Sequence, residues 1–209
     1  MPSERSRAFF GILLILGLFV FVSYLVRTNI GFFQSFIGDS YRGAFAYIII
    51  TIIAVVIAPV SMVPIIPIAS NLFGWFYTGL LNIVGWSIGS FIVFFICRKY
   101  GVSLVKKLVS LEEIEKLESK IPKENMFIDL VLLRMIFPVD LLSYFLSLFS
   151  KVNFRIYSIS TIVGITPFAF VFSYLGVIPL YYQIIGFVTI VLLITIIHFI
   201  REIKKSTSH

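Results

Sequence analysis

Long apolar runs alternate with short polar segments along the chain, and the lengths of these runs predict membrane-spanning helices. About 20 predominantly apolar residues are needed to cross the hydrocarbon core of a bilayer as a helix. On this criterion the sequence predicts four full spans, over residues 8–27, 75–97, 155–178 and 182–200. No small-x-small cleavage pattern follows the first run, so we expect a retained span there rather than a signal peptide.

A cluster of prolines interrupts the longest apolar stretch. Residues Gly43–Ile96 contain no charged side chain in 54 positions, which is too long for one helix and long enough for two crossings. Pro59, Pro64 and Pro67 lie close together within it, and such a cluster removes backbone donors and breaks a helix. The apolar residues before them would form a helix of roughly 22 Å, short of the roughly 30 Å that a span needs. Residues 44–74 are therefore predicted to form a helix, a break and a return.

The largest group of charged side chains lies in residues 98–125, where the apolar residues follow a helical period. They recur at steps of three or four residues, which places them on one face of a helix. They are Leu104, Leu108, Leu111, Ile114, Leu117 and Ile121. We expect an amphipathic helix that rests on the membrane surface or on the cytoplasmic face of the protein.

The next apolar stretch, residues 126–149, differs from the others because it contains ionisable residues and a proline. Asp129, Arg134 and Asp140 lie within it, and Pro138 stands between the last two. A proline inside a helix removes a backbone hydrogen bond, so this stretch is also predicted to be broken.

The composition agrees with a membrane location. Of the 209 residues, 59% are hydrophobic and 13% are charged, and the mean hydropathy is +1.05. A soluble domain has about 25% charged residues, and it could not enclose this much apolar surface. The formal net charge of +7 fits basic cytoplasmic loops. We do not expect nucleic-acid binding, because the sequence has no basic patch interleaved with exposed aromatic residues.

The distribution of Lys and Arg predicts the topology. Residues 98–123 contain seven basic side chains, the C-terminal tail three and the N-terminus two, so all three segments are expected to be cytoplasmic. Only one net crossing then fits between the first span and this loop. The stretch 44–74 must therefore enter and leave from the outside, as a re-entrant hairpin.

The same argument applies to the second broken stretch. Lys151 and Arg155 follow it and favour the cytoplasmic side. Residues 126–149 are therefore expected to enter and leave from the cytoplasm, as a second re-entrant hairpin. Broken backbone at membrane depth is tolerated only where it is buried in protein or lines a cavity, and many transporters build their substrate site from opposed broken helices near the midplane.

The predicted fold is an all-α integral membrane protein that forms a single membrane domain over residues 1–209. It has about four full transmembrane helices, two opposed re-entrant helical hairpins and one amphipathic cytoplasmic helix. Both termini are expected on the cytoplasmic side of a multi-pass protein in the plasma membrane of a prokaryote.

A series of short motifs adds a family resemblance. In chain order they are Phe73-Gly74, Gly79, Gly85, Gly89, Phe94, Arg98, Gly101, Leu133-Arg134, Pro138, Asp140, Tyr144, Gly164, Pro167 and Leu175-Gly176. In their order and spacing, over a core of residues 40–180, the chain resembles the DedA superfamily, also called the VTT-domain or SNARE-associated family. The resemblance implies two opposed re-entrant hairpins, as the charge distribution predicts separately.

The resemblance also implies lipid handling. Members of the family are similar to scramblases or flippases for phospholipids or for polyprenyl phosphate carriers, and some bacterial members are linked to proton-driven transport. Many members have acidic residues in or near the first hairpin, whereas residues 43–96 have none here. This departure favours passive scrambling of membrane lipids with phosphate or anionic headgroups. A proton-coupled small-molecule transporter and a non-transporting membrane scaffold are the alternatives.

Arg134 is the principal candidate for a substrate-binding residue. A charge at membrane depth is costly, so it normally has a partner or a function. A guanidinium can bind a phosphate through two parallel hydrogen bonds. The structural alternative is an ion pair with Asp140 or with Asp129, and both roles can coexist if the pair opens when a lipid arrives.

Asp140 and Pro138 complete this candidate site. Pro138 breaks the helix and could turn Asp140 towards Arg134. Asp140 is then either the counter-charge of Arg134 or a proton carrier, or else it caps the helix that follows the break.

Further candidate residues lie in and after the first hairpin. Pro64, Pro67 and Asn71 would line a passage for a headgroup, or else shape the hairpin for packing alone. Arg98, at the end of a span, is expected to extend to the lipid headgroups, with a substrate role as the alternative.

Catalysis is not expected. Gly85-Trp86-Ser87-Ile88-Gly89 matches the G-x-S-x-G motif of serine hydrolases, but that motif needs a strand-to-helix turn, and here it lies inside a predicted span. The spacing of Gly85 and Gly89 instead favours close helix packing. No nucleotide-binding motif is present, and Cys97 has no clustered partners for a metal site. We expect no cofactor and no metal, and a homo-oligomer is possible.

Overall fold

The computed structural model describes residues 4–37, 41–57, 61–105, 126–136, 142–144, 146–147 and 152–192. Every regular element in these residues is a helix, which confirms the all-α class. In chain order the elements are α1 (Glu4–Thr28), α2 (Ile30–Ile37), α3 (Tyr41–Ile57), the 3-10 helix η1 (Val63–Ile65), α4 (Ile66–Phe73), α5 (Trp75–Val105), α7 (Met126–Ile136), α9 (Phe154–Val177) and a last helix over Leu180–Leu192.

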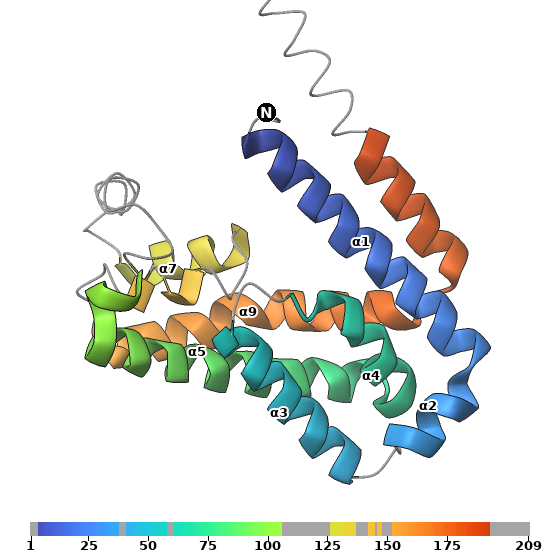
Figure 1. The fold of residues 1–209 in the computed structure, drawn as a ribbon, viewed down its shortest axis with the longest axis horizontal. Helices are drawn as coiled ribbons and strands as arrows, with labels where there is room; N and C mark the ends of the chain where they lie inside the picture. Colours follow the sequence, from blue (N-terminus) through green and yellow to red (C-terminus); the bar gives the residue numbers. More distant parts are fainter. Residues whose placement is uncertain are drawn as a thin grey trace, which may run out of the picture.

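Two long apolar helices form the centre of the molecule. α5 and α9 lie side by side along its longest axis (Figure 1). Both are long and apolar enough to cross a membrane by length and composition, with mean hydropathies of 2.1 and 1.6 over the most apolar 18 residues of Trp75–Gly101 and Phe154–Val177. Their lengths correspond to roughly 36–40 Å of helix, more than the roughly 30 Å of a bilayer core.

Contacts between the two long helices show that they run antiparallel. Near the start of α5, Gly79 lies against the ring of Phe170, close to the end of α9. Near the end of α5, the rings of Phe94 and Tyr157 are 4.6 Å apart between centroids. We call the end of the pair near Gly79 the outer end and the end near Phe94 the inner end, following the sidedness that the charges predict.

The stretch 41–73 folds back on itself at the outer end. α3 runs parallel to α5, because Thr51 and Val55 of α3 meet Gly85 and Gly89 of α5 in the same order. A Cβ at either glycine would lie less than 3 Å from these side chains, at 2.8 Å from Thr51 and 2.7 Å from Val55, so the glycine spacing serves close helix packing here.

After the break, η1 and α4 return towards the start of α5 (Figure 1). Pro64 and Pro67 are the second residues of η1 and α4, within the first turn, where a missing backbone N–H is tolerated. Gly74 then joins α4 to α5 with a φ of 83°, a conformation that favours glycine. Both ends of this helical hairpin therefore lie at the outer end of the α5–α9 pair.

A second broken element lies at the inner end. α7 runs parallel to α9, because Leu130 belongs to a buried cluster with Tyr157 and Arg134 lies against Gly164. Helical residues 142–144 and 146–147 lead back towards the start of α9, where Leu146 packs in the same cluster as Val152.

The two halves of the structure thus repeat one pattern in opposite directions. Each long helix has a glycine ten residues after its first residue, Gly85 in α5 and Gly164 in α9. The helix preceding the break packs on that glycine, through Thr51 in the first half and Arg134 in the second. The arrangement is that of an inverted repeat.

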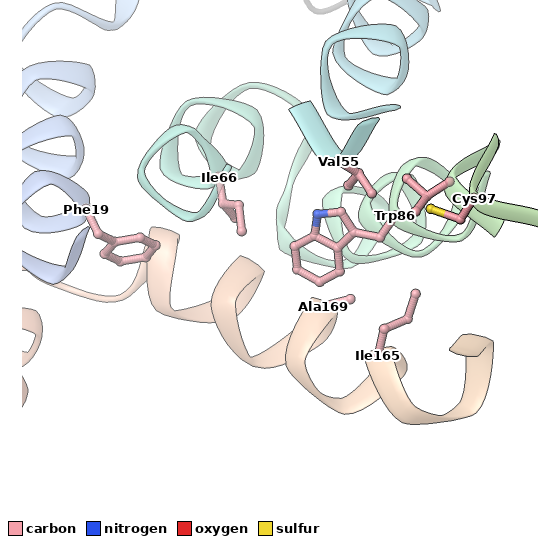
Figure 2. Close-up of a cluster of buried hydrophobic side chains, with 8 residues drawn as sticks. Phe19, Val55, Ile66, Trp86, Cys97, Ile165 and Ala169 are labelled. Carbon is pink, nitrogen blue, oxygen red and sulfur yellow. The ribbon is translucent and has the colours of Figure 1, made fainter. Parts of the chain in front are cut away.

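The main hydrophobic core lies where the first hairpin meets the long helices. Trp86 of α5 lies between Val55 of α3 and Ala169 of α9 (Figure 2). Phe19 of α1 and Ile66 of α4 belong to the same buried cluster. The core therefore joins α1 and the first hairpin to the long pair.

The helix bounds differ from the expected ones mainly at α5. The expected span ended at residue 97 and the amphipathic helix began at 98, whereas α5 continues to Val105 with a break in the helical geometry at Gly101. The rest of the expected amphipathic helix, residues 106–125, lies outside the described part of the chain. At the other spans the structure places helix ends within a few residues of the expected ones, and the last helix is described only as far as Leu192.

Candidate functional site

Arg134 is the most deeply buried charged side chain of the described residues. It lies in the last turn of α7, and only 1% of its surface is exposed. A cation near the C-terminal end of a helix interacts favourably with the helix dipole. The close approach of α7 to α9 depends on Gly164, because a Cβ there would lie 2.5 Å from Cβ of Arg134 and 3.1 Å from the carbonyl oxygen of Val131.

Hydroxyl groups and an aromatic ring surround the guanidinium. Nη1 of Arg134 donates a hydrogen bond to Oγ of Ser143 at 2.8 Å, and this hydroxyl donates to Oγ of Ser90 at 2.9 Å. The guanidinium lies over the ring of Tyr157, with Cζ 5.0 Å from the ring centroid, within the range of a cation–π interaction. The hydroxyl of Tyr157 donates to the carbonyl oxygen of Ser90 at 3.1 Å. We call Arg134, Ser90, Ser143 and Tyr157 the arginine site.

The arginine site lies where the two broken elements meet. Tyr144, next to Ser143, donates a hydrogen bond from its hydroxyl to the carbonyl oxygen of Val56, at the end of α3. Tyr144 also packs against the core cluster that contains Val55 and Trp86. The ends of the two broken elements therefore touch directly beside the buried guanidinium.

Of the two expected counter-charges of Arg134, Asp129 and Asp140, only Asp129 lies within the described residues. Asp129 makes no hydrogen bond or ion pair with Arg134 within the described residues, and its Oδ2 is buried without a donor. Five residues along a helix correspond to a rotation of about 140°, which points the two side chains in different directions. Asp140 and Pro138 lie outside the described residues.

Pro67 and Asn71, two candidates of the first hairpin, lie at the outer end, away from Arg134. Nδ2 of Asn71 donates to the carbonyl oxygens of Pro67, at 2.8 Å, and of Gly176, at 3.0 Å. Pro64 and Pro67 are both buried. Gly176 is separated from Gly164 by roughly 18 Å of helix, so the structure does not bring Pro67 and Asn71 into the arginine site.

Arg98 also lies outside the arginine site. It is exposed near the inner end of α5, where its Nη2 donates to the carbonyl oxygen of Val152 at 2.9 Å. Its Cζ lies 5.0 Å from the centroid of the Phe94 ring. These contacts attach the end of α5 to the segment that leads into α9.

Sequence analysis did not single out a second buried polar group, at the outer end. The hydroxyl of Tyr47 donates to Oδ1 of Asn82 at 2.7 Å, and Nδ2 of Asn82 donates to Oγ of Ser173 at 3.1 Å. These bonds join α3, α5 and α9. A usable signal was present, because Asn82 is an amide within an otherwise apolar helix and Thr78, four residues earlier, lies on the same face.

The G-x-S-x-G segment lies within α5, as expected, and has no strand-to-helix turn. Ser87 is buried, and its hydroxyl makes no hydrogen bond to any described residue. His198, the other residue that a hydrolase would need, lies outside the described part of the chain.

Comparison with known proteins identifies the family. The model of the VTT domain matches residues 59–178, more than half of the 209-residue chain. The matched segment includes α4, α5, α7 and α9, and therefore the whole arginine site. No curated protein and no solved structure gives a significant match. The chain therefore belongs to the family of membrane proteins defined by the VTT domain, the domain of the DedA or SNARE-associated proteins.

Proposed function

We propose that this protein moves phosphate-bearing lipids between the two leaflets of a membrane, and that Arg134 binds the lipid phosphate on the way. The observation that supports the proposal is a fully enclosed guanidinium at the contact between two broken helical elements, in a chain that is otherwise strongly apolar. Opposed broken helices that meet around a polar group are a common way to build a transport site.

The chemistry of the arginine site suits a phosphate. A charge at membrane depth is costly and usually marks a pathway for substrate or ions. The guanidinium has five N–H donors in a planar arrangement that matches two phosphate oxygens. The hydroxyls of Ser90 and Ser143 lie beside it and can rotate to donate to a third oxygen.

The proposed topology has four full spans and two re-entrant hairpins. Arg27, near the end of α1, donates a hydrogen bond to the carbonyl oxygen of Ile178, just after α9. α1 and α9 therefore end on the same side, which is the outside if the basic loops are cytoplasmic. The hairpin 41–73 then opens to the outside and the hairpin that contains α7 opens to the cytoplasm, with both termini cytoplasmic, in the plasma membrane of a prokaryote.

In this arrangement a lipid headgroup could leave one leaflet along one hairpin and reach the other leaflet along the second. Arg134 is almost completely buried, so the contact between the hairpins has to open for a headgroup to reach it. As part of this proposal, we assign the counter-charge of the guanidinium between transport events to Asp140, which lies outside the described residues. Residues 43–96 contain no acidic side chain, which favours passive movement over coupling to protons through the first hairpin.

Reconstitution of the purified protein tests this function. Vesicles containing phosphatidylglycerol with a fluorescent label on one acyl chain are treated with an impermeant reductant, which bleaches only label that reaches the outer leaflet. With a scramblase all of the label is bleached, whereas protein-free vesicles keep the inner-leaflet signal. A membrane scaffold would leave the inner-leaflet signal intact, and that result would reject the proposed function.

A further inference from the structure

A cluster of buried, uncharged polar side chains lies at the outer end of the α5–α9 pair, well away from the arginine site. Its members are Ser70 of α4, Thr78 and Asn82 of α5, and Ser173 of α9, and each is at most 1% exposed. We call these four residues the outer hydroxyl cluster.

Contacts with α9 bring the four side chains together. Nδ2 of Asn82 donates to Oγ of Ser173 at 3.1 Å. Thr78 precedes Asn82 by four residues and so lies on the same face of α5. Ser70 faces the next turn of α9, since a Cβ at Gly176 would lie 3.2 Å from its Oγ. The cluster thus lines the junction of α4, α5 and the last turns of α9.

Two hydroxyls of the cluster have no hydrogen-bond partner in the described part of the chain. Oγ of Ser70 and Oγ1 of Thr78 are buried and make no hydrogen bond to the described residues. A buried helical hydroxyl normally bonds to the carbonyl four residues earlier. In this structure Ser173 does so with Ala169 at 2.7 Å, and Thr51 with Tyr47 at 2.8 Å. Leaving a buried donor unsatisfied destabilises the fold, so unpartnered hydroxyls at this point indicate a ligand.

We propose that the outer hydroxyl cluster is a second binding station for the lipid phosphate, on the side of the outer leaflet. The inference rests on the proposed function and adds a site to it. Hydroxyl and amide groups donate hydrogen bonds to phosphoryl oxygens without a formal charge. Such a site binds a headgroup more weakly than the guanidinium does, and weak binding at successive sites favours passage over trapping.

The distance between the two stations is compatible with transfer of one headgroup. Ser90 of the arginine site and Asn82 of the cluster are separated by eight residues of α5, or roughly 12 Å. Both face the interior of the molecule, at exposures of 0%. The buried side of α5 therefore connects the arginine site with the outer hydroxyl cluster.

The variant Thr78→Val tests the proposal, with Ser70→Ala as a second variant. Each removes a hydroxyl and leaves a side chain of similar or smaller size. We expect the crossing of labelled phosphatidylglycerol in reconstituted vesicles to slow about tenfold, the effect of losing a hydrogen bond to a charged group. The thermal unfolding midpoint of Thr78→Val should stay the same or rise, because an unsatisfied buried hydroxyl is replaced by a methyl group.

Thr166→Val is the matched control, because the hydroxyl of Thr166 bonds to the carbonyl oxygen of Ile162 within α9, at 2.6 Å, and lies outside the cluster. It should transport at the rate of the unmodified protein. Unchanged crossing in both cluster variants would overturn the second station. If Arg134→Gln is slow in the same assay while the cluster variants are not, the proposed function stands and this inference fails.

Uptake of inorganic phosphate into the same vesicles separates a lipid headgroup from free phosphate. The proposal requires that Thr78→Val slows lipid crossing. A variant that slows only the uptake of inorganic phosphate would contradict a lipid station. If the unmodified protein moves no labelled lipid at all, both the proposed function and the second station are rejected.

Discussion

Replacing Arg134 with Gln is expected to slow lipid crossing in reconstituted vesicles by about 10- to 150-fold. Gln removes the charge and the planar pair of donors, and a hydrogen bond to a charged group contributes about 1.5–3 kcal/mol, which corresponds to that range of factors. Arg134→Lys keeps the charge but loses the bidentate geometry. Its crossing rate should therefore lie between the rate of Arg134→Gln and that of the unmodified protein. The measurement is the rate at which labelled phosphatidylglycerol becomes accessible to the impermeant reductant.

Arg155→Gln is the matched control for this experiment. It makes the same chemical change at an exposed position of α9, outside the arginine site. Its rate should equal that of the unmodified protein. Each variant has to be monodisperse in detergent and show a cooperative thermal transition, because removal of a buried charge can also destabilise the fold. A folded Arg134→Gln protein with an unchanged rate would show that the guanidinium is structural.

The second large effect is expected at Gly164. A valine there would place its Cβ 2.5 Å from Cβ of Arg134 and 3.1 Å from the carbonyl oxygen of Val131, so α7 has to move away from α9. Overpacking of this kind typically costs about 1–3 kcal/mol. We expect Gly164→Val to lower the thermal unfolding midpoint and, because Arg134 is displaced, to reduce lipid crossing to the level of protein-free vesicles.

Gly17→Val and Gly186→Val provide the comparison, since a Cβ at either position would meet nothing within 4 Å. Both variants should keep the stability and the transport rate of the unmodified protein within error. Equal stability of Gly164→Val and the two controls would contradict the close packing of α7 on α9.

The helical elements could be predicted because their signals are local. Apolar runs of sufficient length predicted α5 and α9, and the proline cluster predicted the break between α3 and α4. The buried position of Arg134 was also expected, because it lies within an apolar stretch that is long enough to enter the membrane. The extension of α5 beyond residue 97 was not predicted, because a change from apolar to charged residues does not by itself end a helix.

The partners of Arg134 could not be predicted from the sequence. Ser90, Ser143 and Tyr157 are separated from one another by 14 to 67 residues, and they meet only because α5, α7 and α9 pack together. Small hydroxyl residues are common in apolar helices, so no single one of them predicts a contact.

Asn71 was expected to line a passage for a headgroup or to help shape the first hairpin, and the sequence did not indicate which residues it contacts. α4 runs back along the last turns of α9, where Asn71 bonds to the carbonyl oxygen of Gly176. The direction of the return after a proline break depends on tertiary packing, which the sequence pattern does not contain.

Single-cysteine labelling tests most directly whether the first hairpin opens to the outside and the segment before α9 lies on the cytoplasmic side. In a Cys97→Ala background, cysteines replace Tyr41 and Tyr77, which are 96% and 67% exposed and stand on either side of the first hairpin. A third variant carries a cysteine in place of the exposed Asn153, before α9. A membrane-impermeant maleimide added to intact cells should label both Tyr41→Cys and Tyr77→Cys, and it should label Asn153→Cys only after the membrane is opened. Labelling of the Tyr41 and Tyr77 positions from opposite sides would show that residues 41–73 cross the membrane completely, and it would contradict the account.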